Sequence, residues 1–153
     1  MNKVTPFLWF NNRALEAAKN YTAIFKDSKI ESIMHKGSSE EDIEENILTI
    51  SFSITGQEFI GLNGGNEFTF NESISFSIAC ENQEEIDYYW GKLTKEGQEV
   101  QCGWLKDKYG ISWQVVPKNM GELMYSEDPK RTKMKMDKML GMKKLVIEEL
   151  KNI

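Results

Sequence analysis

One order of elements, a strand, then a helix, then further strands, occurs twice in the sequence and constrains the fold more than any other feature. The first copy spans residues 3–65 and the second spans residues 73–117, with Gly64-Gly65-Asn66 interrupting the pattern between them. A repeated unit of this size indicates duplication, with the two units packed side by side. We therefore predict an α+β fold with two βαβββ modules in a single domain, residues 1–153.

The first module contains the clearest strand pattern of the chain. Apolar and hydroxyl residues alternate over residues 47–55, which predicts a strand with one buried face. Apolar residues recur at three- and four-residue spacing over residues 14–25, which predicts a helix with Asn11 or Asn12 as its N-cap. The acidic segment 37–46 is predicted to be a flexible, solvated hairpin loop. Further strands are predicted over residues 3–10, 29–35 and 58–63.

The second module repeats this order with fewer residues. A strand is predicted over residues 73–79, followed by a helix that Asn82 caps and Gly97 ends. A further strand is predicted over residues 99–104. The stretch CGWLKDKYGISWQVVP, residues 102–117, then indicates a hairpin with a charged turn that leads into a buried strand.

The C-terminal segment, residues 118–153, differs from both modules because its pattern is helical and rich in methionine. A short helix is predicted around Met120–Met124, and a second helix begins at Asp128-Pro129. Six of the eight methionines lie between residues 120 and 142. Because methionine packs adaptably, we expect this segment to pack against a sheet or a partner subunit, and lining a ligand pocket is the alternative.

The composition indicates an ordinary globular chain and argues against several classes of protein. A chain of 153 residues can bury a full hydrophobic core. The net charge of -5 argues against binding to nucleic acid or to an anionic membrane surface. No apolar run reaches about 18 residues, and the N-terminal apolar block is too short for a secretory signal, so we expect a cytoplasmic protein without a membrane span.

The cysteines and the single histidine do not form a metal-binding motif. Cys80 and Cys102 each lie in a strand-like run, where buried reduced thiols are common in intracellular proteins, and we predict neither a disulfide nor a catalytic thiol. His35 has no histidine or cysteine near it in the sequence and is predicted to be an ordinary strand residue. Catalytic residues therefore stay unassigned.

Four stretches that together cover nearly the whole chain resemble one known family. They are TPFLWFNNRALEAAKNYTAIFKDSKI, GQEFIGLNGGNEFTFNESISFSIAC, YYWGKLTKEGQEVQCGWLKDKYGISWQVVP and DPKRTKMKMDKMLGMKKLVIEEL. They resemble the PhnB-like branch, also called 3-demethylubiquinone-9 3-methyltransferase-like, of the glyoxalase/bleomycin-resistance (vicinal oxygen chelate) superfamily. The resemblance implies two modules whose mixed sheets curve into a cup, often completed across a homodimer, and we expect a homodimer here.

Metal-using relatives in this superfamily hold a divalent ion in the cup through His, Glu or Gln side chains, and the ion stabilises a substrate anion. Matched by motif, the ligand positions fall at Thr5 and Ser73, where relatives have His, and at Gln114, where they usually have Glu. Two hydroxyls and one amide do not hold a transition metal tightly. We therefore predict no metal and no cofactor.

Strand alternation selects the side chains that would face the cup. If Thr5 points inward, so do Phe7 and Trp9, although a register slip of one residue would reverse this assignment. Gln114 then either hydrogen-bonds a small polar ligand or bonds neighbouring groups in a filled barrel. An inward Gln114 would also place Ser112 inward, and Trp113 toward the helix.

Two further residues are candidates for ligand binding, and each has a second possible role in the fold. Asn63, in the sequence LNGG, is either a turn residue or a hydrogen-bonding group at a pocket rim. Trp104 either stacks on a planar ligand or belongs to the core. The ligand-binding candidates are therefore Phe7, Trp9, Asn63, Trp104 and Gln114.

Three functions are compatible with these features, and the fold alone does not choose among them. The first is a protein that binds a small molecule in a metal-free cup, where the acidic charge favours neutral or cationic ligands. The second is an enzyme, either the methyltransferase of the branch name or a lyase or isomerase. The usual methyl-donor fold has a Gly-rich loop after its first strand, whereas Asn11-Asn12-Arg13 follow here. The third is a dimeric protein with a filled cup and no ligand.

Overall fold

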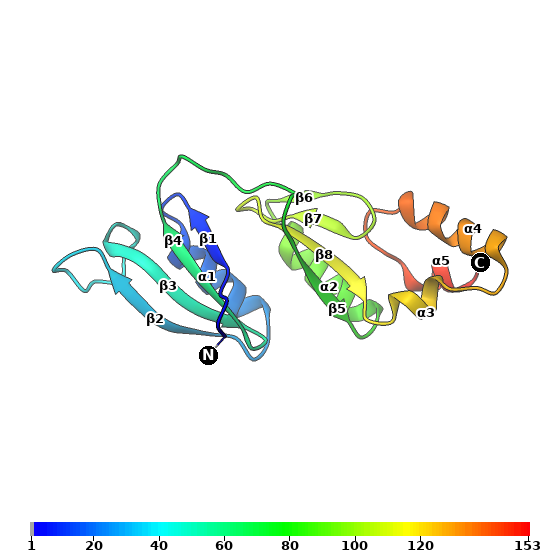
Figure 1. Ribbon diagram of the computed structural model, residues 1–153, viewed down its shortest axis with the longest axis horizontal. Helices are drawn as coiled ribbons and strands as arrows, with labels where there is room; N and C mark the ends of the chain where they lie inside the picture. The colour runs from blue at the N-terminus through cyan, green and yellow to red at the C-terminus, as the bar shows by residue number, and fades with distance from the viewer. Residues whose placement is uncertain (1) are drawn as a thin grey trace. The chain divides into compact units, whose positions relative to one another are not determined.

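The computed structural model describes residues 2–153, and Figure 1 shows the arrangement of its helices and strands. The chain divides into two compact units between Phe70 and Asn71. The first unit contains the first predicted module, and the second unit contains the second module together with the C-terminal helices.

The first unit is a four-stranded sheet with one helix. Its sheet has the strand order β1-β4-β3-β2, in which β1 and β4 are parallel and the other neighbours are antiparallel. Its elements are β1 Phe7–Phe10, α1 Ala14–Ile24, β2 Lys29–His35, the short 3-10 helix η1 Glu44–Asn46, β3 Ile47–Ile54 and β4 Gln57–Asn63.

The second unit repeats this topology. Its sheet has the order β5-β8-β7-β6, again with the first and last strands of the module parallel. Its elements are β5 Ser75–Cys80, α2 Gln83–Thr94, β6 Gln98–Glu99, β7 Trp104–Lys106 and β8 Ser112–Pro117. The predicted α+β fold of two βαβββ modules is therefore confirmed.

Three helices follow the second module, namely α3 Met120–Met124, α4 Pro129–Leu140 and α5 Ile147–Lys151. As predicted, Pro129 stands at the start of α4, and the Asp128 carboxylate caps it by accepting a hydrogen bond from the backbone N–H of Lys130 at 3.0 Å. Between residues 2 and 153 no helix is long and apolar enough to cross a membrane.

The core of the first unit lies between α1 and one face of its sheet. Tyr21 of α1 stacks on Phe52 with 6.3 Å between ring centroids, and Phe52 stacks on Phe59 at 5.7 Å. Gly61 allows the helix to approach β4 closely, because a Cβ at this position would lie 3.2 Å from the Cβ of Ala14. Phe52 therefore lies on the buried face of β3, as the alternation of apolar and hydroxyl residues over 47–55 predicted.

The N-terminus of α1 is not capped by Asn11 or Asn12, and that prediction is wrong. Asn12 has a left-handed backbone with φ 59°, and Arg13 occupies the N-cap position without a side-chain capping hydrogen bond. The first N–H groups of the helix are instead satisfied by residues distant in the sequence, which local patterns do not reveal.

Asn63 and Glu44 provide this distant cap. Asn63 Oδ1 accepts a hydrogen bond from the backbone N–H of Ala14 at 2.9 Å. The Glu44 carboxylate accepts hydrogen bonds from the N–H groups of Leu15 and Glu16, both at 3.0 Å, and its negative charge is favourable beside a helix N-terminus. Because Asn63 also donates to Glu44 at 3.2 Å, the cap ties α1, β4 and η1 together.

The charged turn between β7 and β8 is organised by one buried carboxylate. Asp107 Oδ1 accepts hydrogen bonds from the N–H groups of Tyr109 and Ile111 at 2.9 and 3.0 Å. Its Oδ2 accepts from Trp113 Nε1 at 2.9 Å. The predicted hairpin over residues 102–117 is therefore confirmed at its turn, because Asp107 fixes both the turn and the following strand.

The strand predicted over residues 99–104 is wrong, because β6 ends at Glu99 and the chain turns before β7. Cys102 and Gly103 have left-handed φ angles of 59° and 82°. Their N–H groups donate to the carbonyl oxygens of Met142 and Lys143 at 2.7 and 2.8 Å. The C-terminal segment thus supplies the partners that a neighbouring strand would otherwise supply.

The C-terminal helices pack on the second unit through a small apolar cluster. Gln83 of α2 fastens this segment, since its amide donates to the Leu145 carbonyl oxygen at 3.0 Å and accepts from Ile147 N–H at 2.9 Å. The predicted packing role thus holds for Met142, which is buried, whereas Met134 and Met136 are exposed. The buried members of the cluster are Leu123, Met142, Leu145 and Leu150.

The capping of α1 by Asn63 leads to a prediction about the stability of the protein. Asn63→Ala removes the acceptor for Ala14 N–H inside the protein, so we expect the free energy of unfolding to fall by about 2–3 kcal/mol in urea denaturation. Asn82→Ala is the matched control, since it removes the exposed cap of α2, where Asn82 accepts from Glu85 N–H at 3.0 Å. We expect this control to lose about 1 kcal/mol. Equal losses would contradict a buried capping role for Asn63.

Candidate functional site

The face of the first sheet opposite α1 is not covered by any helix of its unit, and we call it the first uncovered face. Phe7 and Trp9 lie on it, next to Ile60 and Leu62 of the parallel neighbour β4. The Phe7 side chain is 59% exposed, whereas the intervening Leu8 is buried toward α1. The structure therefore has the register in which Phe7 and Trp9 share one face, away from the helix.

Trp9 is held in place by the segment that follows β4. Its indole Nε1 donates to the Gly65 carbonyl oxygen at 2.9 Å, and its ring meets the edge of Phe68 with 4.9 Å between centroids. A Cβ on Gly64 would lie 2.4 Å from the Trp9 ring, so only glycine fits at this position. The two glycines of LNGG thus fix an aromatic side chain on the first uncovered face.

Asn63 does not lie on this face. It is 6% exposed, on the helix side of β4, and its amide bonds Ala14, Glu44 and the Ile47 carbonyl oxygen. Neither of its two predicted roles, a turn residue or a rim donor, describes this position. A buried asparagine that caps a helix from a neighbouring strand has no local sequence signal.

The opposite end of the first uncovered face is polar and hollowed. Lys29, Ser53 and Glu58 form a row across β2, β3 and β4. Ser53 Oγ donates to Glu31 Oε1 at 3.4 Å, and both residues line the hollow. The hollow has a volume of about 450 Å³ and carries three carboxylates against one ammonium group, which favours a neutral or cationic occupant. It is lined by Asp27, Ser28, Lys29, Glu31, Ser53, Gly56 and Glu58.

The second sheet also has a face opposite its helix, which we call the second uncovered face. Trp104 and Gln114 are direct neighbours across β7 and β8, and Ser112 lies on the same face, whereas Trp113 is buried on the helix side. Gln114 Nε2 donates to Ser75 Oγ at 2.9 Å. Its Oε1 accepts no hydrogen bond from any residue within 2–153, so one half of this amide is available to a ligand.

The three positions at which the resemblance implies metal ligands, Thr5, Ser73 and Gln114, do not fit a divalent ion here. Thr5 precedes β1, and Ser73 precedes β5, where its Oγ donates to Asn71 Oδ1 at 2.6 Å. Gln114 offers a neutral amide oxygen. Within residues 2–153, no three His, Cys, Asp or Glu side chains lie together as a metal-binding group. A tight site needs several anionic or imidazole donors, and these three side chains supply none.

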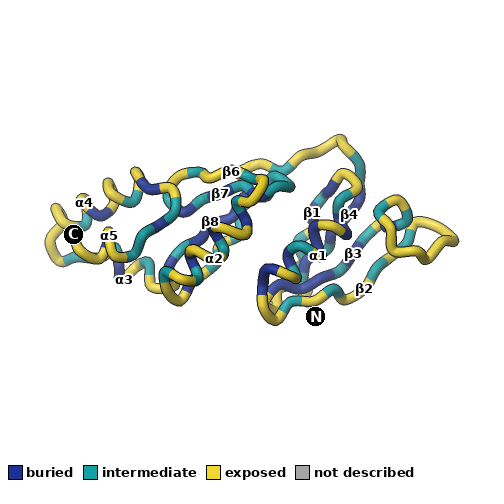
Figure 2. The backbone as a smooth tube through the Cα atoms, turned by 180° about the vertical axis from the view of Figure 1, so that it is seen from behind, coloured by how far each residue is buried: buried dark blue, intermediate teal, exposed yellow. Residues whose placement is uncertain are grey.

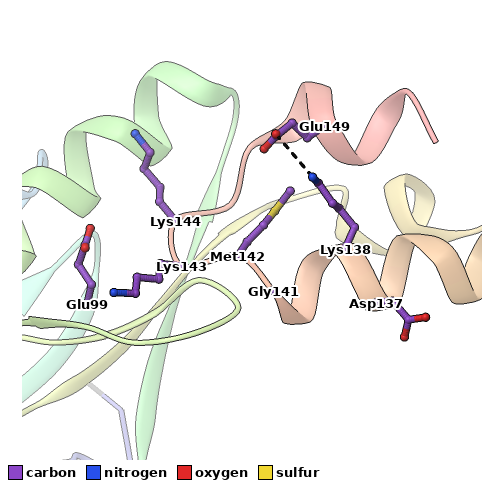
Figure 3. Close-up of a pocket in the computed structure, with 8 residues that line it drawn as sticks. All are labelled: Glu99, Asp137, Lys138, Gly141, Met142, Lys143, Lys144 and Glu149. Atoms are coloured by element: carbon purple, nitrogen blue, oxygen red, sulfur yellow. Dashed lines mark ion pairs between the residues drawn. The ribbon is translucent and has the colours of Figure 1, made fainter.

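A second hollow, of about 560 Å³, lies in the second unit between β6 and the C-terminal segment (Figure 3). Its charges are largely neutralised within the protein, since Lys138 lies 3.8 Å from Glu149 and Lys144 lies 2.8 Å from Asp87. Glu99 accepts a hydrogen bond from Trp90 Nε1 at 2.6 Å. We therefore assign no ligand to this hollow.

The family model for 3-demethylubiquinone-9 3-methyltransferase matches residues 2–116. The chain belongs to this family. A Bacillus cereus protein named as a 3-demethylubiquinone-9 3-methyltransferase, PhnB protein, is 34% identical over 76% of this chain and 99% of its own, with a TM-score of 0.67. The PhnB-like resemblance found in the sequence is therefore confirmed.

Two other solved structures are similar to this chain at lower sequence identity. A Pseudomonas aeruginosa protein is 17% identical over 77% of this chain and 98% of its own, with a TM-score of 0.63, which supports the fold alone. A glyoxylase/bleomycin resistance protein/dioxygenase domain from Frankia sp. is 16% identical over 76% of this chain and 97% of its own, and its TM-score of 0.46 is too low for a conclusion. No curated protein matches the sequence.

The family match ends before the C-terminal helices. The stretch DPKRTKMKMDKMLGMKKLVIEEL, one of the four on which the resemblance rests, lies beyond the matched residues 2–116. The PhnB-like part of the chain is thus the two modules, which carry both uncovered faces.

The two thiols of this PhnB-like chain differ in burial. Cys80 is buried at the end of β5, and burial raises the pKa of its thiol to about 12, with the Glu85 carboxylate adding to the shift. Cys102 is partly exposed in its turn. Because the thiolate is the reactive form, we expect one fast and one slow thiol at pH 8 in a chromogenic disulfide-exchange assay. Cys102→Ala should abolish the fast phase, and a fast phase that survives would contradict this assignment.

Proposed function

We propose that this chain binds a small, neutral or cationic molecule with a planar apolar part on the uncovered faces of its sheets, without a metal ion. The observation that carries the proposal is the pairing, on the first uncovered face, of an exposed aromatic end with an acidic hollow. Phe7 and Trp9 form the aromatic end, and Glu58 lines the hollow at the other end.

The aromatic end is preorganised for stacking. Trp9 is fixed by its hydrogen bond to the Gly65 carbonyl oxygen and by the lack of space at Gly64, so little side-chain entropy is lost when a ligand binds. Aromatic pairs contribute about 0.5–1.5 kcal/mol beyond the burial of their area. A planar ligand on Phe7 would also cover apolar surface that its unit leaves in solvent.

The second uncovered face offers a complementary set of groups. Trp104 is a partly exposed aromatic ring, and the neighbouring Gln114 has a free amide oxygen that can accept a hydrogen bond. The Ser112 hydroxyl beside it is buried and has no hydrogen-bond partner among residues 2–153. Because Ser112 is buried, a polar ligand on this face can reach the Gln114 amide oxygen rather than this hydroxyl. The cup and the homodimer stay predictions.

Methyl transfer is the second candidate function, and the family to which the chain belongs is the observation that favours it. The geometry gives it less support, because β1 is followed by Asn11-Asn12-Arg13 rather than by a Gly-rich loop that could hold a nucleotide-containing methyl donor. A lyase or isomerase would need a Lewis acid or a placed general base. Glu58 and Glu99 are the carboxylates nearest strand edges, and we assign a catalytic role to neither.

Binding can be tested with a tail-less benzoquinone as the planar probe. We expect the probe to raise the melting temperature of the protein in the presence of a chelator, because a ligand of the folded state stabilises it. Phe7→Ala should raise the dissociation constant of the probe roughly twofold to tenfold, because one aromatic contact is lost. Isothermal titration calorimetry measures this change.

Tyr125→Ala is the matched control, since Tyr125 is as exposed as Phe7 but lies beyond α3. We expect this variant to bind the probe as tightly as the unchanged protein. Loss of binding on removing metal, or equal weakening by both variants, would contradict the proposal. A melting-temperature rise with S-adenosylmethionine alone would favour methyl transfer instead.

A further inference from the structure

The first uncovered face has an apolar row and a polar row of side chains next to each other. Phe7 of β1 pairs with Ile60 of β4. Glu58 lies two residues before Ile60, on the same side of β4, and pairs with Ser53 of β3. Because each strand residue adds about 3.3 Å, roughly 7 Å along the sheet separates the row of Phe7 from the row of Glu58. One small molecule can therefore contact both rows.

The negative charge of the hollow in the polar row is only partly neutralised by the protein. The one ammonium group of the hollow, that of Lys29, lies 3.8 Å from Glu31 Oε2. Asp27 and Glu58 also line the hollow, and neither forms an ion pair with any residue within 2–153. Glu58 Oε2 accepts one long hydrogen bond, from the Asn2 N–H at 3.4 Å. Two carboxylates are thus left for a cationic group of a ligand to neutralise.

Ser53 adds a further acceptor to these carboxylates, from the buried side of the hollow. Its residue is 7% exposed, and its Oγ donates to Glu31 while no residue among 2–153 donates to it. Ser53 and Glu58 are direct neighbours across β3 and β4, so their Cβ atoms lie about 5 Å apart. A primary ammonium group has three N–H donors and no acceptor, and it therefore matches a site that offers acceptors from several side chains.

The hollow has the size of a ligand site and is open along β2. Its volume of about 450 Å³ lies within the range of about 300–1,000 Å³ that is usual for small-molecule pockets. No residue of β2 is buried, and Figure 2 shows this strand as exposed or intermediate along its length. A charged group can therefore enter the hollow from solvent and keep part of its hydration.

We propose that the ligand of the first uncovered face is an arylalkylamine. Its aromatic ring packs on Phe7 and Ile60, and its primary ammonium group enters the hollow and donates to Glu58, Ser53 and Asp27. A spacer of about two or three carbon atoms between ring and nitrogen spans the distance between the two rows. This inference rests on the proposed function and narrows its ligand from neutral or cationic to cationic, because hydrogen bonds from an ammonium group to carboxylates are stronger than those from a neutral donor.

The test compares 3-phenylpropylamine with its neutral analogue 3-phenyl-1-propanol by isothermal titration calorimetry at neutral pH, low salt and with a chelator. The amine should have a dissociation constant about threefold to tenfold lower than the alcohol, and added salt should reduce this difference. Glu58→Gln should remove most of the difference by weakening the amine alone. Phe7→Ala should weaken both probes, because both carry the ring. Unchanged binding of the alcohol to Glu58→Gln shows that this variant is folded.

Glu40→Gln is the matched control, since it changes the net charge equally, and Glu40 is exposed in the loop after the other end of β2. This control should bind both probes as the unchanged protein does. Equal binding of amine and alcohol, or equal effects of Glu58→Gln and Glu40→Gln, would overturn the arylalkylamine. The proposed function would still stand in that case if the benzoquinone probe binds and Phe7→Ala weakens it. Absence of binding by all three probes would overturn both.

Discussion

A single helix covers only one face of a four-stranded sheet, and the rest of this structure depends on that constraint. In each module the helix buries one set of alternating side chains, such as Phe52 and Phe59 against Tyr21 in the first unit. The alternate set, including Phe7, is left without a covering layer in its unit. Contiguous exposed apolar patches can mark binding surfaces, and Phe7 is 59% exposed on the first uncovered face. The duplicated topology leaves one face of each sheet without a covering helix of its own unit.

Sequence patterns predicted those features that depend on local alternation and spacing. The strand β3, the turn at Asp107 and the capping of α2 by Asn82 all follow from contacts within a few residues, and the structure confirms them. The register that groups Phe7 with Trp9 also follows from alternation, once β1 is paired with β4.

The predictions that were wrong concern places where distant parts of the chain meet. Asn63 caps α1 across 49 residues, and no local pattern marks an asparagine for that role. Residues 99–104 have a strand-like pattern, but Cys102 donates its N–H to Met142, so the segment bends away from the sheet. In both places tertiary hydrogen bonds determined the backbone, and propensity was overridden.

Whether a fold binds a metal ion depends on a few donor side chains rather than on its sheets. Thr5, Ser73 and Gln114 carry no charge, so none of these three positions supplies an anionic or imidazole donor. Membership of the 3-demethylubiquinone-9 3-methyltransferase family establishes the relationship of this chain, and the proposed ligand site rests on the side chains of the uncovered faces.

The indole N–H resonances of the four tryptophans test this account most directly. In a titration with the benzoquinone probe and a chelator, the Trp9 and Trp104 signals should shift, because both rings belong to the uncovered faces. The Trp90 and Trp113 signals should stay in place, because both rings are buried on the helix sides. Unchanged Trp9 and Trp104 signals, or shifts that require added metal, would contradict it.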